Sequence, residues 1–169
     1  MTGVQRATAR TRRTRYVQWT GSLTGFPDEW LERLTPLADG ILRVQTKRGP
    51  ILTHPTSYIL EGERGIYPAP KGVAEYNYDL RADGWATRRP TEVEFVPWTG
   101  RFEDLPDTWR MHGAFSFSLA GRLVVQSLEG RLMAEDDDRI IRGPFGEFYP
   151  SSLDTFRRNY HVQRAVAHA

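Results

Sequence analysis

The feature that most constrains the fold of this chain is a long internal repeat. The stretch from Val44 to Tyr78 is echoed by the stretch from Val125 to Tyr160, and the echo extends upstream to residues 17–21 and 96–100. The matched identities fall mostly on tryptophan, glycine, proline and tyrosine, the residue types that fix turns and cores. They include Trp19 with Trp98, Gly21 with Gly100, Trp30 with Trp109, Ile59 with Ile140, Gly62 with Gly143, Tyr67 with Tyr149 and Tyr78 with Tyr160. We interpret the chain as two copies of one module.

Local patterns within each copy favour short strands and short helices. Residues 41–46 and 114–119 alternate in the way of half-buried strands, while 71–77 and 153–159 suit helices. The sequence therefore predicts an α+β fold made of two tandem copies of a small antiparallel β-sheet module with short helices. The predicted parts are a basic flexible arm at 1–14, a first module at 15–80, a linker at 81–93 (with an edge strand at its end as an option), a second module at 94–162 and a tail at 163–169.

The composition excludes several classes of chemistry. The chain has no cysteine, which rules out disulfides, thiolate catalysis and cysteine-based zinc sites. The lack of cysteine fits a reducing compartment, and no run of residues approaches the apolar length of a membrane span. We therefore expect a cytoplasmic location and no membrane partner.

Positive charge is concentrated at the N-terminus. The formal net charge of the chain is +2, and the five arginines before the first acidic residue account for +5, which leaves −3 for residues 16–169. A polar, arginine-rich arm suits binding to phosphate, nucleic acid or an acidic partner, and it suits equally a solubilising tail. The candidate nucleic-acid-binding residues are Arg6, Arg10, Arg12, Arg13 and Arg15.

Several segments carry a resemblance to a known family. The runs VQWTG at 17–21, VPWTG at 96–100, SLEG at 127–130 and GEFYPSSLDTFRRNY at 146–160 resemble a small phage-protein family often called PGDYG proteins. The resemblance implies a phage or prophage origin and a single-copy module that is duplicated here, and it implies no particular reaction. At the family's proline-glycine-aspartate turn the second copy keeps only Asp138 and the first copy keeps only Pro55. The first copy is the more degenerate, so a site is expected to survive only in the second.

Catalytic and metal-binding patterns are incomplete. Glu135 with the run 136–138 offers carboxylates to Mg²⁺ or Ca²⁺, or it forms a solvated turn in which Asp138 accepts backbone N–H groups. The four histidines have no zinc-motif spacing. We predict no metal and no cofactor, and an enzyme would require Asp138, Glu147 and His161 to meet in one cleft.

The recurring aromatic residues have two interpretations. Large aromatic side chains usually build cores, and the alternative is an aromatic platform for a nucleobase with arginines beside it. The candidate ligand-binding residues are Trp98, Tyr149, Arg139, Arg142 and Glu147.

The functional prediction is a non-enzymatic phage-type accessory protein in the host cytoplasm that binds a small nucleotide-like ligand or a host protein. The alternative is a nucleic-acid-binding protein that uses the arm. A nucleotide site should be a concave pocket with an arginine and an aromatic residue, whereas a protein-binding site should be a flat apolar patch.

Overall fold

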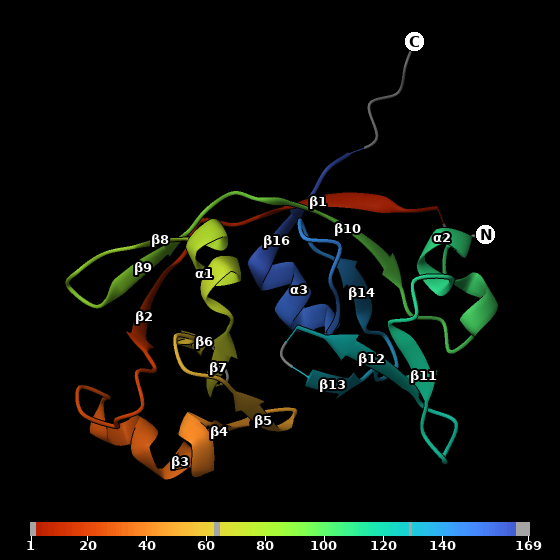
Figure 1. Ribbon diagram of the computed structural model, residues 1–169. Coiled ribbons are helices and arrows are strands. Elements are labelled where there is room, and N and C mark those ends of the chain that lie inside the picture. The colour runs from red at the N-terminus through yellow and green to blue at the C-terminus, as the bar shows by residue number, and fades with distance from the viewer. Residues whose placement is uncertain (1–2, 63–64, 129, 165–169) are drawn as a thin grey trace. The chain divides into compact units, whose positions relative to one another are not determined.

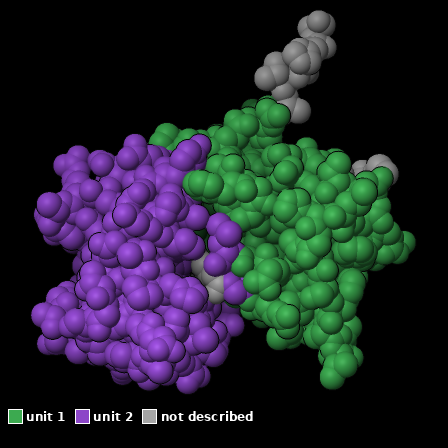
Figure 2. Space-filling model, in the orientation of Figure 1, with its two compact units in different colours: residues 1–10, 90–127, 131–169 green, residues 11–89, 128–130 purple. Residues whose placement is uncertain are grey.

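The computed structural model describes residues 3–62, 65–128 and 130–164, and the chain divides into two compact units. Unit 1 comprises residues 1–10, 90–127 and 131–169, and unit 2 comprises residues 11–89 with 128–130 (Figure 2). Antiparallel sheets and a few short helices make up both units. The predicted α+β class, with small antiparallel sheets and short helices, is confirmed at this level.

Unit 2 contains a five-stranded and a three-stranded antiparallel sheet. Its elements are β2 (Arg13–Gln18), η1 (Asp28–Arg33), β3 (Leu34–Pro36), η2 (Ala38–Gly40), β4 (Leu42–Thr46), β5 (Gly49–Thr53), β6 (Tyr58–Gly62), β7 (Gly65–Ala69), α1 (Lys71–Asn77), β8 (Tyr78–Leu80) and β9 (Trp85–Arg88), where η marks a 3₁₀ helix. The larger sheet has the strand order β7-β6-β2-β9-β8, and the smaller one has the order β3-β4-β5.

Unit 1 is built from the same kinds of sheet. Its elements are β1 (Gln5–Ala9), β10 (Glu92–Pro97), η3 (Phe102–Asp104), α2 (Asp107–Arg110), β11 (Phe115–Phe117), β12 (Leu123–Ser127), β13 (Gly130–Met133), β14 (Arg139–Arg142), β15 (Phe148–Ser151), α3 (Leu153–Asn159) and β16 (Tyr160–Val162). The larger sheet has the order β15-β14-β10-β1-β16, and the smaller one has the order β11-β12-β13.

The two larger sheets correspond strand by strand. In unit 2, Val17 of β2 lies opposite Ile59 of β6, and in unit 1, Val96 of β10 lies opposite Ile140 of β14. The place of β9 in unit 2 is taken in unit 1 by β1, which comes from the other end of the chain. Each sheet is therefore completed by a strand that is separated along the sequence from the rest of its pattern.

Strand β1 is an integral part of unit 1. It lies between β10 and β16 (Figure 1). Ala7 is paired with Val93 of β10 on one side and with Val162 of β16 on the other. Ala7 is fully buried and Ala9 nearly so. The prediction of a flexible arm at 1–14 is therefore wrong for residues 5–9, and also for residues 13–14, which begin β2.

The other predicted boundaries also shift. The predicted linker at 81–93 contains β9 and the start of β10, and β9 lies between β2 and β8, so it is not the edge strand that the prediction allowed. Gln163 is held in place, because its backbone N–H donates to the Arg6 carbonyl at 3.0 Å and its side chain donates to Thr8 and Glu92. Residues 165–169 of the predicted tail lie outside the described residues.

The larger sheet of unit 1 buries apolar side chains on both faces. One face packs around Trp98, Trp109 and Phe148, and the other packs around Phe95 and Phe156 of helix α3. Helix α3 begins after Ser152, whose Oγ accepts a hydrogen bond from the Thr155 N–H at 3.3 Å. The N-cap of this helix is therefore Ser152.

Because β1 belongs to the sheet of unit 1 and β9 to the sheet of unit 2, we predict that the chain survives a cut between β8 and β9. A protease site inserted between Ala82 and Asp83, in the exposed turn between β8 and β9, separates residues 1–82 from 83–169. Each fragment still holds one strand in the other fragment's sheet, so the cut protein should elute as one complex in native size-exclusion chromatography and separate only in denaturant.

A buried charge in β1 provides the control for this experiment. Ala7→Asp places an unpaired carboxylate between β10 and β16, which should cost at least about 2 kcal/mol of unfolding free energy and weaken the nicked complex. Arg6→Ala, at an exposed position of the same strand, should leave the unfolding free energy and the stability of the nicked complex nearly unchanged. Equal behaviour of the two variants would contradict the placement of β1.

Candidate ligand site

The first two arginines of the predicted arm contact the sheet of unit 1. Arg6 forms an ion pair with Glu92 at 3.5 Å, and Arg10 Nε donates to the Tyr160 carbonyl at 3.2 Å. Both arginines lie on or directly after a paired strand. They therefore do not belong to a free arm.

The other three arginines belong to unit 2. The guanidinium of Arg13 lies 4.3 Å from the centre of the Trp85 ring. Arg12 is half-buried, and its carbonyl accepts the Arg88 N–H at 2.7 Å. The five arginines are thus divided between two units and do not form one basic segment.

Arg15 is the centre of an ion cluster. Its Nε and Nη2 donate to the two carboxylate oxygens of Glu61 at 2.7 and 2.9 Å, and its Nη2 lies 2.8 Å from Glu29. The Arg15 hydrogen bonds lower the pKa of Glu61 below its ordinary value, and the bond to Glu61 raises the pKa of Arg15. The guanidinium also lies 5.5 Å from the Trp30 ring centre. These contacts give Arg15 a structural role in unit 2.

The predicted ligand residues of the second copy are divided between the two faces of one sheet. Trp98 belongs to one core cluster, and the Arg142 guanidinium lies on that face, 5.9 Å from the Phe148 ring centre. Tyr149 packs against the opposite cluster, which contains Ile141. The structure therefore does not bring Trp98 and Tyr149 into one pocket.

The repeated tyrosines form matched hydrogen bonds. The hydroxyl groups of Tyr149 and Tyr160 lie 2.5 Å apart in unit 1, and those of Tyr67 and Tyr78 lie 2.6 Å apart in unit 2. In each pair, one tyrosine lies in the strand before a helix and the other is the first residue after that helix. This agrees with the interpretation of these aromatic residues as architecture.

Glu147 shapes a tight turn. Its Oε2 accepts the Phe145 N–H at 2.8 Å, and its Oε1 lies only 1.8 Å from the place where a Cβ on Gly143 would stand. The carboxylate thus occupies the space that a side chain at position 143 would need. Glu147 was predicted as a ligand residue, and the structure gives it this role in the turn.

The acidic run forms the predicted turn. Asp138 is 1% exposed, and its Oδ2 accepts the Glu135 N–H at 2.9 Å. Arg139, another predicted ligand residue, donates from Nη1 to the Asp137 carbonyl at 3.0 Å. The interpretation of Asp138 as an acceptor of backbone N–H groups is confirmed.

The three residues that an enzyme would require lie in separate elements. Asp138 is buried in its turn, Glu147 folds over Gly143, and His161 is exposed on β16 opposite Thr8. Across residues 3–62, 65–128 and 130–164, no group of three or more histidine, aspartate or glutamate side chains is arranged to hold a metal ion.

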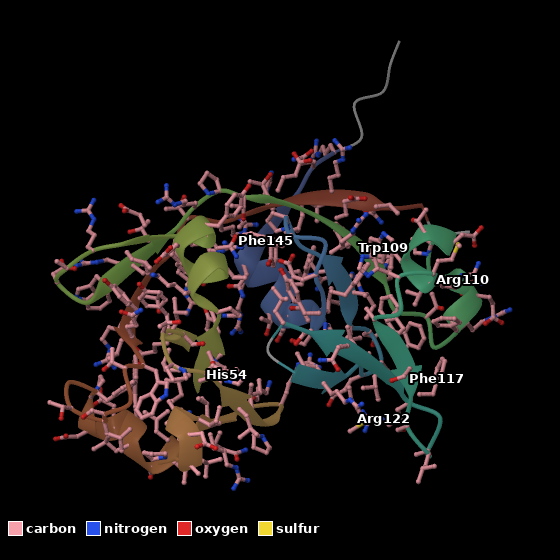
Figure 3. All side chains as sticks on the ribbon, viewed as in Figure 1. His54, Trp109, Arg110, Phe117, Arg122 and Phe145 are labelled. Atoms are coloured by element: carbon pink, nitrogen blue, oxygen red, sulfur yellow. The ribbon has the colours of Figure 1, made fainter. Side chains whose placement is uncertain are left out.

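A hollow of about 590 Å³ lies within unit 1. Three segments line it: the end of β10, the tip of the β11–β12 hairpin, where Arg122 lies (Figure 3), and the turn before β14. Arg122 and Glu135 form an ion pair at 4.0 Å. The lining residues are Trp98, Gly100, Gly121, Arg122, Leu123, Ala134, Glu135 and Asp136.

The tryptophan of the hollow differs from its counterpart in one hydrogen bond. The backbone N–H of Trp98 donates to Asp138 at 2.8 Å, as that of Trp19 does to Ser57. Trp19 Nε1 also donates to the Gly40 carbonyl at 2.7 Å. Trp98 is 9% exposed, and its Nε1 has no acceptor among the described residues. Unit 1 therefore has an unused donor at the hollow.

The same position is filled in unit 2. A Cβ on Gly40 would lie 2.9 Å from Cγ of Pro55, so the proline ring covers this glycine. Gly121 is the matching hairpin glycine in unit 1, and a Cβ there would meet nothing within 4 Å. Asp136 stands where unit 2 has the proline. The proline ring of unit 2 thus occupies a place that is open above Gly121 in unit 1.

Of the predicted ligand residues, only Trp98 lines the hollow. Gly100, Gly121 and Leu123 stand where the two repeated stretches agree, whereas the charged lining residues stand where the stretches differ, so agreement between the stretches does not indicate them. The available signal was disagreement at aligned positions. At aligned positions, Ile41 corresponds to Arg122, His54 to Glu135 and Pro55 to Asp136. His54 and Arg122 are labelled in Figure 3.

Comparisons with protein-family models, curated proteins and solved structures gave no match to this chain. The resemblance to PGDYG proteins therefore stays a prediction. Among the described residues, no helix has the length and apolar character that crossing a membrane requires.

The two tryptophans predict unequal effects of one substitution. Trp→Phe removes the indole N–H at a nearly buried position in both cases. At residue 19 it also strips the Gly40 carbonyl of its donor, so Trp19→Phe should lower the unfolding free energy by about 1 kcal/mol more than Trp98→Phe. Urea unfolding measures both. Equal losses would contradict the unused donor at Trp98.

Glu61 predicts an acid-sensitive contribution to stability. Its pKa is lower in the folded protein, chiefly because Arg15 donates to it, so this contribution is complete above its ordinary pKa of 4.5. As the pH falls below 4.5 the unfolded chain takes up a proton first, and the contribution is lost on the way to the folded pKa. Urea unfolding against pH should give a shallower acid loss for Glu61→Gln than for wild type. Identical slopes would contradict the assignment.

Proposed function

We propose that this chain is a non-enzymatic binding protein of phage type, acting in a host cytoplasm, that holds a small nucleotide-like ligand in the hollow of unit 1. The observation that carries the proposal is the contrast at matched positions. Pro55 covers Gly40 in unit 2, whereas Gly121 borders an open hollow in unit 1. A volume of about 590 Å³ also falls in the usual range for small-molecule sites.

The proposal includes a duplication in which each copy gives its first strand to the other unit. Residues 7–10 and 86–89 align with the same offset as Trp19 and Trp98. Their hydrogen bonds also match: the Arg10 N–H donates to Asn159 at 2.7 Å, and the Arg89 N–H donates to Asn77 at 2.8 Å. One copy then runs from β1 to β8 and the other from β9 to β16.

Duplication provides a physical reason for an open site in one copy only. Two equal copies each carry the tryptophan and the hairpin glycine, so either could keep the ring that closes the hollow. The charged residues Arg122, Glu135 and Asp136 stand in unit 1 at positions where unit 2 has Ile41, His54 and Pro55. Such replacements are costly in a core and tolerable at a wet, ligand-facing surface.

A host protein is the second candidate partner. Leu119, at the tip of the β11–β12 hairpin, is fully exposed, and Phe117 on the same hairpin is half exposed. Leu119→Ser should weaken the binding of such a protein partner and leave the binding of a small ligand unchanged. The nucleic-acid alternative loses its premise, because the five arginines do not form a free arm.

The proposal predicts that a proline abolishes binding. Asp136→Pro copies the residue of unit 2, and no described hydrogen bond of the Asp136 N–H is lost. The proline ring should cover Gly121 and lower the affinity for any nucleoside or nucleotide by at least about tenfold. The unfolding free energy of the protein should be retained. Calorimetric titration of a nucleoside and nucleotide panel against the full chain measures this.

Pro55→Asp in unit 2 is the matched control and should bind like wild type. Binding that survives Asp136→Pro would place the ligand elsewhere. A complete lack of binding across the panel would overturn the proposed function.

A further inference from the structure

The hollow selects against phosphate. One guanidinium, that of Arg122, faces two carboxylates, those of Glu135 and Asp136, and it already forms an ion pair with the first of them. A phosphate placed there would meet more negative than positive charge. The part of a ligand that enters the hollow is therefore neutral or a donor of hydrogen bonds.

The indole N–H of Trp98 is available to an acceptor on a ligand. Trp98 is nine-tenths buried and lines the hollow, yet Nε1 has no acceptor among the described residues. A donor at the wall of a hollow can exchange water for a ligand oxygen or nitrogen. A carbonyl oxygen placed at Trp98 would supply the bond that Gly40 supplies to Trp19 in unit 2.

The carboxylates require the opposite partner. Glu135 and Asp136 accept hydrogen bonds only, so a ligand that satisfies them carries N–H groups beside its carbonyl. The backbone on the facing side is bare, because Gly100 and Gly121 have no side chain and nothing lies within 4 Å of either Cβ position. A flat ring can approach such a surface closely.

We propose that the hollow recognises the Watson–Crick edge of a guanine base, and this proposal rests on the proposed function. That edge presents a carbonyl oxygen, a ring N–H and an exocyclic amino group side by side. The carbonyl accepts from Trp98, and the two nitrogens donate to Glu135 and Asp136. The sugar and any phosphate stay outside, in solvent.

Titration calorimetry of the full chain with four probes tests this assignment. Guanosine should bind. Inosine lacks the amino group and should bind about tenfold more weakly. Adenosine presents donors and acceptors in the wrong order and should bind more weakly still, and guanosine 5′-monophosphate should bind no more tightly than guanosine.

Two variants tie the preference to the residues. Trp98→Phe removes the donor and should lower the affinity for guanosine about tenfold. The matched Trp19→Phe should leave the affinity for guanosine unchanged. Glu135→Gln should reduce the difference between guanosine and inosine.

The outcomes separate the two proposals. If another nucleoside binds best and Asp136→Pro abolishes its binding, the guanine assignment is overturned and the proposed function stands. Guanosine binding that Trp98→Phe leaves unchanged also overturns the assignment. If no nucleoside or nucleotide binds, both are overturned.

Discussion

The pairing of β1 between β10 and β16 is the interaction on which unit 1 depends. Without it, β16 would have no neighbour in the sheet, and the apolar face around Phe95 and Phe156 would lose Ala7 and Ala9. Strand β9 has the same position in unit 2. Both sheets thus need a strand from a distant part of the sequence, and the order of strands along the chain makes the two units mutually dependent for folding.

The same strand order places a tryptophan at the matching position of each unit, Trp19 in unit 2 and Trp98 in unit 1. The backbone N–H of each tryptophan is fixed by the turn before the next strand, so Trp19 and Trp98 are presented alike. What varies is the partner of the indole. In unit 2 the Gly40 carbonyl and the Pro55 ring close the position, and in unit 1 a hollow with charged walls remains.

Local signals predicted the helices and many strands, and non-local ones were missed. Helices 71–77 and 153–159 were predicted with the bounds that α1 and α3 have. The residues that favour the start of a helix and the apolar residues on its face lie close together in the sequence, so a local pattern is enough to find such a helix. Strand β1 carries only small and polar side chains, so burial of Ala7 is visible only once β10 and β16 are present. The hollow was missed for a related reason, since Gly121 and Asp136, which both line it, come from a hairpin and from a turn that are separated along the sequence.

Two sheets of matching strand order in one chain face the problem of pairing with the wrong partner, and the charges address it. Arg15 of β2 pairs with Glu61 of β6, whereas at the matched place in unit 1 Glu94 of β10 lies opposite Arg142 of β14. If β2 paired with β14, two arginines would face each other, and β10 with β6 would set two glutamates together. Like charges directly across a sheet are destabilising. Because the buried residues of the two sheets are so similar, apolar packing discriminates poorly, and the reversed ion pairs favour each strand's own sheet.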